Sequence, residues 1–124
     1  MKLLLDTHAA LWWLSDDDRM GADAARHLSD DSNHVLLSAA VVWEVAIKRA
    51  LGKLRAPSDL GPVLLAAGVQ PLAISVEHVA AVEALPAHHR DPFDRMLVAQ
   101  ASLEDATMVS RDPAVRQYDI ATVW

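Results

Sequence analysis

The alternation of short apolar runs with helix-like segments constrains the fold of this chain more than any other feature. The apolar runs predict buried strands over Lys2–Asp6, His34–Ser38, Pro71–Ser75, Thr107–Ser110 and Ile120–Trp124. The segments between them predict helices over His8–Leu14, Ala22–Leu28, Ala39–Leu51, Ser58–Ala67, Val76–Leu85 and Pro92–Asp105. This alternation favours an α/β fold with a parallel sheet that is covered by helices on both faces.

The composition narrows the class of protein. A chain of 124 residues is long enough to bury one core, so we expect a single domain over residues 1–124. It has no cysteine, which excludes disulfide bonds and thiolate metal sites. Its formal net charge of −6 gives no overall positive field that would attract nucleic acid. A role on nucleic acid would therefore need local basic residues or bound cations.

The N-terminal segment does not look like a targeting sequence. One lysine and three leucines precede Asp6, which is too short for a signal peptide. No apolar run approaches the roughly 20 residues of a membrane span. We therefore expect a cytoplasmic protein without membrane contact.

Four acidic residues lie beside the predicted strands. Asp6 ends the first strand, and Asp112 follows the fourth strand in MVSRD. Asp94 lies at the start of the helix before that strand, and Glu44 lies in the helix after HVLLS. In a parallel sheet the carboxyl ends of the strands meet at one edge, where ligands bind. The sequence therefore predicts that the four acids converge at this edge.

Helix capping is an alternative role for each aspartate. Asp6 can cap the helix that follows it, and Asp112 precedes a proline in a common helix-start pattern. The stretch Asp91–Asp94 resembles a capping box in which aspartate replaces glutamate. Capping alone is the more frequent role of an aspartate at such a position.

Glu44 has two competing interpretations. Its neighbours in VVWEVAI are apolar, which indicates that much of this helix surface is buried. The glutamate either points outward in a polar stripe with Lys48, four residues on, or faces a polar cleft. The sequence does not decide between the two.

Taken together, the acids indicate a metal centre. Ionised carboxylates that share a site repel one another and raise one another's pKa. A hard divalent cation among them removes this repulsion, and Asp and Glu oxygens are the ligands that Mg²⁺ or Mn²⁺ prefers. Such a cation can activate water and assist a displacement at phosphorus. The acids are therefore suited to a metal-dependent phosphodiesterase.

Four blocks of the sequence resemble a known family. In chain order they are MKLLLDTHAALWWL, SAAVVWEVAIKRALGKL, RDPFDRMLVAQA and MVSRD. Together they resemble the PIN-domain ribonucleases, and they are most similar to the VapC toxins of bacterial toxin–antitoxin pairs. The resemblance covers essentially the whole chain.

The resemblance implies a three-layer α/β/α sandwich and a Mg²⁺-dependent endoribonuclease, with Mn²⁺ as a possible substitute. It maps the acidic positions of the family onto Asp6, Glu44, Asp94 and Asp112. Asp94 is preferred to Asp91 because it directly precedes the apolar run of the helix. The resemblance further implies an antitoxin partner, an RNA substrate and a homodimer.

The hydroxyl positions of the family correspond to Thr7 and Ser38, although helix capping explains both residues equally well.

A basic cluster at the end of the Glu44 helix is the best candidate for contact with RNA phosphates. It consists of Lys48, Arg49, Lys53 and Arg55. The same residues would also complement the dipole at the C-terminal end of that helix. Arg90, Arg95 and Arg111 flank the acids and can pair with phosphate or with the acids themselves.

Histidines and tryptophans near the acids have simpler roles as well. His8 lies two residues after Asp6 and can reach substrate, or it can be a first-turn helix residue. His88 and His89 lie in a polar loop, where they would suit a transition-metal site if another ligand joined them, but we expect them to be solvated. Trp12 and Trp13 point about 100° apart on a helix, so we expect one of them at a partner or dimer surface.

Two other functions compete with the nuclease. Aspartyl-phosphate phosphatases also begin with a strand that ends in aspartate, but they need a second aspartate where this chain has His8. A non-catalytic α/β module would use the acids as helix caps and the tryptophans to dock a partner.

Overall fold

The computed structural model describes all 124 residues and contains one five-stranded sheet. The strand order is β3-β2-β1-β4-β5, and every neighbouring pair is parallel. The strands are β1 (Lys2–Leu5), β2 (His34–Ser38), β3 (Gln70–Leu72), β4 (Thr107–Val109) and β5 (Thr122–Val123). The predicted PIN-like α/β fold with a central parallel sheet is confirmed.

Six α-helices and one 3₁₀ turn connect the strands. They are α1 (Thr7–Leu14), α2 (Ala22–Leu28), α3 (Ala39–Ala50), α4 (Leu60–Ala66), α5 (Val76–Glu83), α6 (Pro92–Glu104) and η1 (Val115–Gln117). None of these helices combines the length and the apolar character that crossing a bilayer requires.

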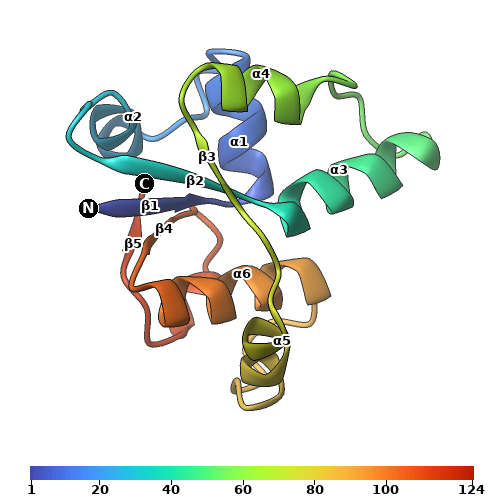
Figure 1. Cartoon of the computed structure of the whole chain (residues 1–124), viewed down its shortest axis with the longest axis vertical. Coiled ribbons are helices and arrows are strands. Elements are labelled where there is room, and N and C mark those ends of the chain that lie inside the picture. Colours follow the sequence, from blue (N-terminus) through green and yellow to red (C-terminus); the bar gives the residue numbers. More distant parts are fainter.

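The helices cover both faces of the sheet (Figure 1). Helices α1 to α4 lie on one side of the strands, and α5 and α6 lie on the other. This follows from the connections, because the chain moves from β1 outward to β2 and β3 and then crosses back to β4 and β5. Right-handed crossovers in opposite directions place their helices on opposite faces. The core centres on β1, whose Leu3, Leu4 and Leu5 are fully buried.

Several predicted elements are shorter than expected; the predicted strand over Ile120–Trp124, for example, is only Thr122–Val123. The predicted helix over Ser58–Ala67 begins at Leu60, and the predicted strand over Pro71–Ser75 is the edge strand β3, Gln70–Leu72. The strand ends early because Ser75 is the N-cap of α5. Its hydroxyl accepts from the His78 backbone, and its own backbone N–H donates to Nδ1 of His78. Ser75 therefore belongs to the start of α5, although the apolar pattern predicts it as the end of the strand.

The strand order places a topological switch between β1 and β4. Connections from β1 run toward β2, whereas β4 is reached from the other side of the sheet. Ligands in open α/β sheets bind in the crevice beyond the carboxyl ends of strands at such a point. The chain emerging from β1 enters α1, and the chain emerging from β4 passes through Asp112. The N-terminal ends of these connections therefore surround one crevice.

The C-terminal strand ends close to that crevice. A Cβ atom on Gly21 would lie 2.3 Å from the backbone carbonyl carbon of Trp124. Only glycine allows this approach, which seats the Trp124 indole against Trp12 with ring centroids 5.7 Å apart. The contact connects the end of the chain to α1.

Candidate metal centre

The crevice at the carboxyl ends of β1 and β4 is a polar pocket of about 400 Å³. All four acids that the sequence singles out lie in its wall, together with the competing aspartate: Asp6, Glu44, Asp91, Asp94 and Asp112. They come from the end of β1, from α3, from the start of α6 and from the segment after β4. The fold thus brings together residues that are far apart in the sequence.

Asp6 both caps α1 and lines the pocket. Its Oδ1 accepts from the backbone N–H of Ala9 at 2.8 Å, and its side chain is buried. Burial raises the pKa of Asp6 above its ordinary value, while the Ser110 hydroxyl and the Ala9 amide oppose the rise. The cap engages one carboxylate oxygen, so capping does not exclude a role in the pocket.

Asp91 and Asp94 divide two roles between them. The Asp91 carboxylate accepts from the backbone N–H groups of Phe93 at 2.8 Å and Asp94 at 3.0 Å, so Asp91 is the N-cap of α6. The reciprocal bond of a capping box is absent, because the Asp94 carboxylate points toward His89 instead. Asp94 is therefore the acid at this corner without a capping bond.

The pKa of Asp94 is raised to about 7. Burial is the largest cause, and the charge of Asp91 adds to it; His89 opposes the rise, and Glu44 and Asp6 contribute further increases. Burial is thus the main factor that disfavours the ionised form of Asp94, and repulsion from the neighbouring acids adds to it in the absence of a cation.

Glu44 faces the polar cleft and keeps its ion pair with Lys48, so the interpretation in which it points outward is wrong. It is buried in the wall of the pocket, and Lys48 one turn on donates to its Oε2 at 2.5 Å. The Thr7 hydroxyl donates to Oε1, also at 2.5 Å. The hydrogen bond to Glu44 is the main reason that the pKa of Lys48 is raised. Both carboxylate oxygens of Glu44 are thus held in place from α1 and α3.

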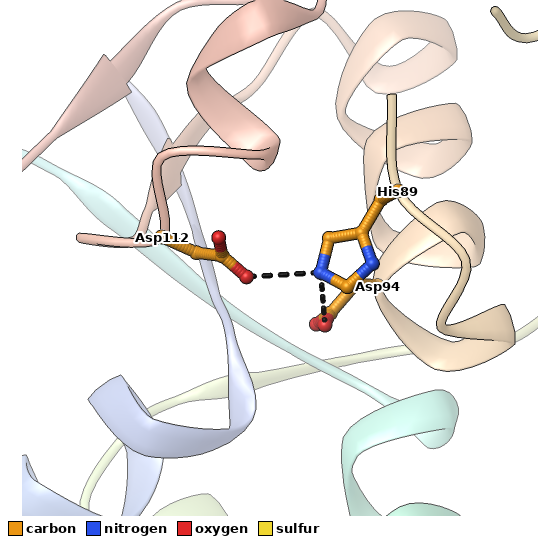
Figure 2. Close-up of side chains that lie close together, drawn as sticks. All are labelled: His89, Asp94 and Asp112. Atoms are coloured by element: carbon orange, nitrogen blue, oxygen red, sulfur yellow. Dashed lines mark hydrogen bonds and ion pairs between the residues drawn. The ribbon is translucent and has the colours of Figure 1, made fainter. Parts of the chain in front are cut away.

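His89 lies inside the site, so the expectation that His88 and His89 are both solvated is wrong for His89. Figure 2 shows its ring between two acids. Its Nε2 lies 2.9 Å from Oδ2 of Asp112 and 3.1 Å from Oδ2 of Asp94. Each of these three residues has one atom that could bind a metal ion, and the three atoms lie within 4.8 Å of one another. His88 is exposed and packs edge-on against Tyr118.

A backbone hydrogen bond fixes the tautomer of His89. The Asp91 N–H donates to Nδ1 of His89 at 3.0 Å, so Nδ1 acts as an acceptor. The neutral ring then carries its proton on Nε2, which becomes a donor toward the two carboxylates. His89 thus bridges the α6 corner and the segment after β4 without needing a charge.

The loop that carries His89 is tied down from α6. The Arg95 guanidinium donates to the carbonyl oxygens of Pro86 and Val82, each at 3.0 Å, and to the Tyr118 hydroxyl at 3.2 Å. The same hydroxyl accepts from the His89 backbone at 2.9 Å. Arg95 therefore holds the loop and contacts no acid, contrary to the expectation that it pairs with them or with phosphate.

Of the two predicted hydroxyl positions, Thr7 lies at the acidic pocket and Ser38 does not. Thr7 lines the pocket through its bond to Glu44. Ser38 is fully buried away from the pocket, where it caps α3 and donates to Gln100 at 2.5 Å. Ser110 is the hydroxyl that sequence reasoning missed, because it bonds Asp6 and accepts from the Asp112 backbone at 3.2 Å. Its position two residues before Asp112 in VSRD was the only available signal.

The predicted basic cluster does not form one free surface. Lys48 pairs with Glu44, and the Arg49 guanidinium donates to the carbonyl oxygen of Ala56 at 2.7 Å. Lys53 is exposed, and Arg55 turns into a second pocket near α1. Arg111 was predicted beside the acids, and it lies in the wall of the acidic pocket.

Trp12 and Trp13 both pack at the edge of the core, and a partner or dimer surface at either of them stays a prediction. Trp12 is 6% exposed and packs against Trp124. Trp13 is half-buried and packs against the core. Trp124, which also lines the acidic pocket, and His8, which is exposed at its rim, complete this side of the site.

The side chains of the pocket fit a hard divalent cation. Five carboxylates face a volume in which Lys48 is already paired with Glu44 and His89 bridges two of the acids. Oxygen ligands and an excess of negative charge suit Mg²⁺ or Mn²⁺. The arrangement can therefore hold a cation next to an anionic substrate.

Comparison with known proteins agrees with this geometry. A family model described as PIN domain matches residues 3–121. The chain belongs to the PIN-domain family. No curated protein sequence matches it significantly.

Solved structures share the fold of this PIN domain at low sequence identity. VapBC2 from Rickettsia felis bound to a promoter DNA fragment gives a TM-score of 0.74 at 13% identity, covering 100% of this chain and 99% of that one. VapBC-1 from nontypeable Haemophilus influenzae gives 0.67 at 16%, covering 99% and 97%. FitAcB from Neisseria gonorrhoeae gives 0.62 at 20%, covering 98% and 96%. At these sequence identities the likeness shows a shared fold only.

Replacement of Asp94 by asparagine should stabilise the cation-free PIN domain at alkaline pH. An acid whose pKa rises on folding destabilises the fold as the pH rises from 3.8 through about 7. The shift corresponds to at most roughly 4 kcal/mol above pH 7. In EDTA, the Tm of the parent should therefore fall across this range, and the Tm of Asp94→Asn should fall much less. The exposed Asp18→Asn is the control; if its pH profile matched that of Asp94→Asn, the repulsion would not centre on Asp94.

Replacement of His89 by alanine should weaken cation binding about tenfold, because partners that orient ligating carboxylates typically contribute 10- to 100-fold. His89→Gln keeps an N–H donor and should retain most of the affinity. Isothermal titration with Mn²⁺ measures both variants, with His88→Ala as the matched control. Equal affinities of His89→Ala and His88→Ala would show that His89 does not position the acids.

Proposed function

We propose that this PIN-domain protein is a divalent-cation-dependent endoribonuclease and the toxin of a VapC-type toxin–antitoxin pair. The observation that carries the proposal is the convergence of five carboxylates from four segments in one pocket. The raised pKa of Asp94 supports it, because such a cluster favours a bound cation. A single domain over residues 1–124 and a cytoplasmic location are parts of the proposal.

In this proposal Asp6 and Asp94 are the central ligands of Mg²⁺ or Mn²⁺, and Glu44 and Asp112 complete or orient the site. A bound cation of this kind supplies charge that polarises a phosphodiester and lowers the pKa of a water molecule. Attack of water on phosphorus with cleavage of the P–O3′ bond would leave a 5′-phosphate on one product and, once the leaving oxygen takes a proton, a 3′-hydroxyl on the other.

The chain's own residues hold the acids in position for this reaction. Thr7 and Lys48 fix the two oxygens of Glu44, and the Ser110 hydroxyl and the Ala9 amide fix Asp6. His89 holds Asp112 through the Nε2 hydrogen bond. A preorganised set of ligands lowers the cost of arranging them around the cation and the substrate.

The proposed partners are RNA, a cognate antitoxin and a second copy of the chain. The solved structures that share this fold include VapBC and FitAcB assemblies, and one is described as a toxin–antitoxin complex from Klebsiella pneumoniae. An acidic pocket on a chain of net charge −6 suits a partner that offers arginine or lysine in place of the cation. The homodimer rests on the resemblance alone.

Replacement of Asp6 by asparagine should reduce RNA cleavage by about a hundredfold or more, because it removes a charged ligand of the cation. Asparagine can still cap α1 and removes a buried carboxylate of raised pKa, so the Tm should be equal to or above that of the parent. Cleavage of single-stranded RNA in Mg²⁺, with EDTA as the metal-free reference, measures the effect.

The exposed Asp18→Asn serves as the control for the lost charge. If Asp6→Asn cleaves RNA at the rate of the parent and of this control, the metal-dependent nuclease is not the function of this site.

A further inference from the structure

A second pocket adjoins the acidic one on the α1 side. It has a volume of about 410 Å³ and is lined in part by Trp12, Arg19, Arg55 and Pro57. His8 and Arg111 line both pockets, so the two share a wall. We propose that this second pocket is a subsite for a nucleotide of single-stranded RNA, next to the bond that is cut. The inference rests on the proposed nuclease function and names how its substrate is held.

The charge of the second pocket is opposite to that of the protein. One of its three arginines, Arg19, is neutralised by Asp17 through bonds of 2.8 and 3.0 Å, which lower the pKa of Asp17 to about 2. The guanidinium groups of Arg55 and Arg111 donate no hydrogen bond and form no ion pair within the chain. The pocket therefore offers two guanidinium groups that are free to bind an anion, although the protein as a whole has a net charge of −6. Guanidinium groups bind phosphate through paired N–H donors.

Aromatic rings give the pocket flat surfaces. The Arg111 Cζ lies 4.4 Å from the centroid of the Trp12 ring, and the His8 ring stacks on Trp12 at 5.1 Å. The buried Trp12 ring thus supports the His8 ring and the Arg111 guanidinium group. Both of these groups are exposed, so they are the accessible flat surfaces of the pocket. Unpaired bases stack on aromatic rings and on arginine planes, which a duplex does not allow. The combination of stacking surfaces and free guanidinium groups fits a single strand better than an acidic protein segment.

Arg111 lines both pockets, so it can contact a substrate that spans them. It directly precedes Asp112, one of the proposed metal-site acids, and contacts Trp12 in the second pocket. A phosphate bound by Arg111 would therefore neighbour the phosphodiester at the acidic pocket. Arg55 lies only in the second pocket and touches none of the acids, so it tests the subsite separately.

The test is binding of a short fluorescein-labelled single-stranded RNA in EDTA, which prevents cleavage, followed by fluorescence anisotropy. Arg55→Glu should weaken binding about tenfold, and Arg55→Ala should lower the salt slope by about 0.7, the value for one phosphate contact of a single strand. Arg116→Glu is the matched control, because Arg116 is exposed, outside both pockets and equally unpaired. All three substitutions should leave the Tm unchanged.

Three results would overturn the subsite. They are equal RNA affinity of Arg55→Glu and Arg116→Glu, equal binding of a duplex RNA of the same sequence, and binding of an acidic peptide but not of RNA by the parent.

Cleavage assays in Mg²⁺ separate the subsite from the nuclease proposal. If the parent cleaves RNA, Arg55→Glu should raise KM and leave kcat unchanged; an unchanged KM would refute the subsite and leave the nuclease intact. If the parent binds RNA through Arg55 but Mg²⁺ produces no cleavage, the subsite stands and the nuclease proposal fails.

Discussion

Mutual repulsion of carboxylates in one pocket is the constraint on which this structure depends. The parallel topology brings the segments after β1 and β4, the middle of α3 and the start of α6 to one crevice, and each carries an acid into it. The fold itself supplies only partial compensation. Lys48 pairs with Glu44, and its raised pKa also reflects the charges of Asp91 and Asp94. His89 donates into the gap between two further acids. The remaining repulsion is what a cation would remove.

Capping and ligand binding are compatible in this site because a carboxylate has two oxygens. The Oδ1 of Asp6 accepts from the Ala9 N–H, and the Oδ1 of Asp112 accepts from the Ala114 N–H at 2.9 Å while its Oδ2 contacts His89. The backbone bonds hold each carboxylate in a fixed orientation at the start of its helix or turn. Asp94 lacks such a bond and carries the pKa of about 7. The caps therefore hold Asp6 and Asp112 in place, whereas Asp94 makes no such bond and its pKa is raised by burial and by its acidic neighbours.

The sequence predicts the sheet and the convergence of acids because both depend on local patterns and on one topological rule. Asp6 and Asp112 follow apolar strands, and parallel strands share a carboxyl edge. His89 could not be predicted, since its role depends on a loop that Arg95 and Tyr118 hold from distant positions. The basic cluster is divided in the structure, because Lys48 and Arg49 have partners within the chain, and its contact with RNA stays a prediction. Spacing along the chain identifies charges, but pairing across the fold decides which remain free.

The most direct test of the account is an X-ray structure of crystals soaked in Mn²⁺, with data collected to exploit the anomalous scattering of manganese. The account predicts one strong anomalous peak in the acidic pocket, at bonding distance from oxygens of Asp6 and Asp94. An anomalous peak only outside the acidic pocket would contradict the account. So would the absence of any peak in the pocket while its carboxylates stay as close together as in the present structure.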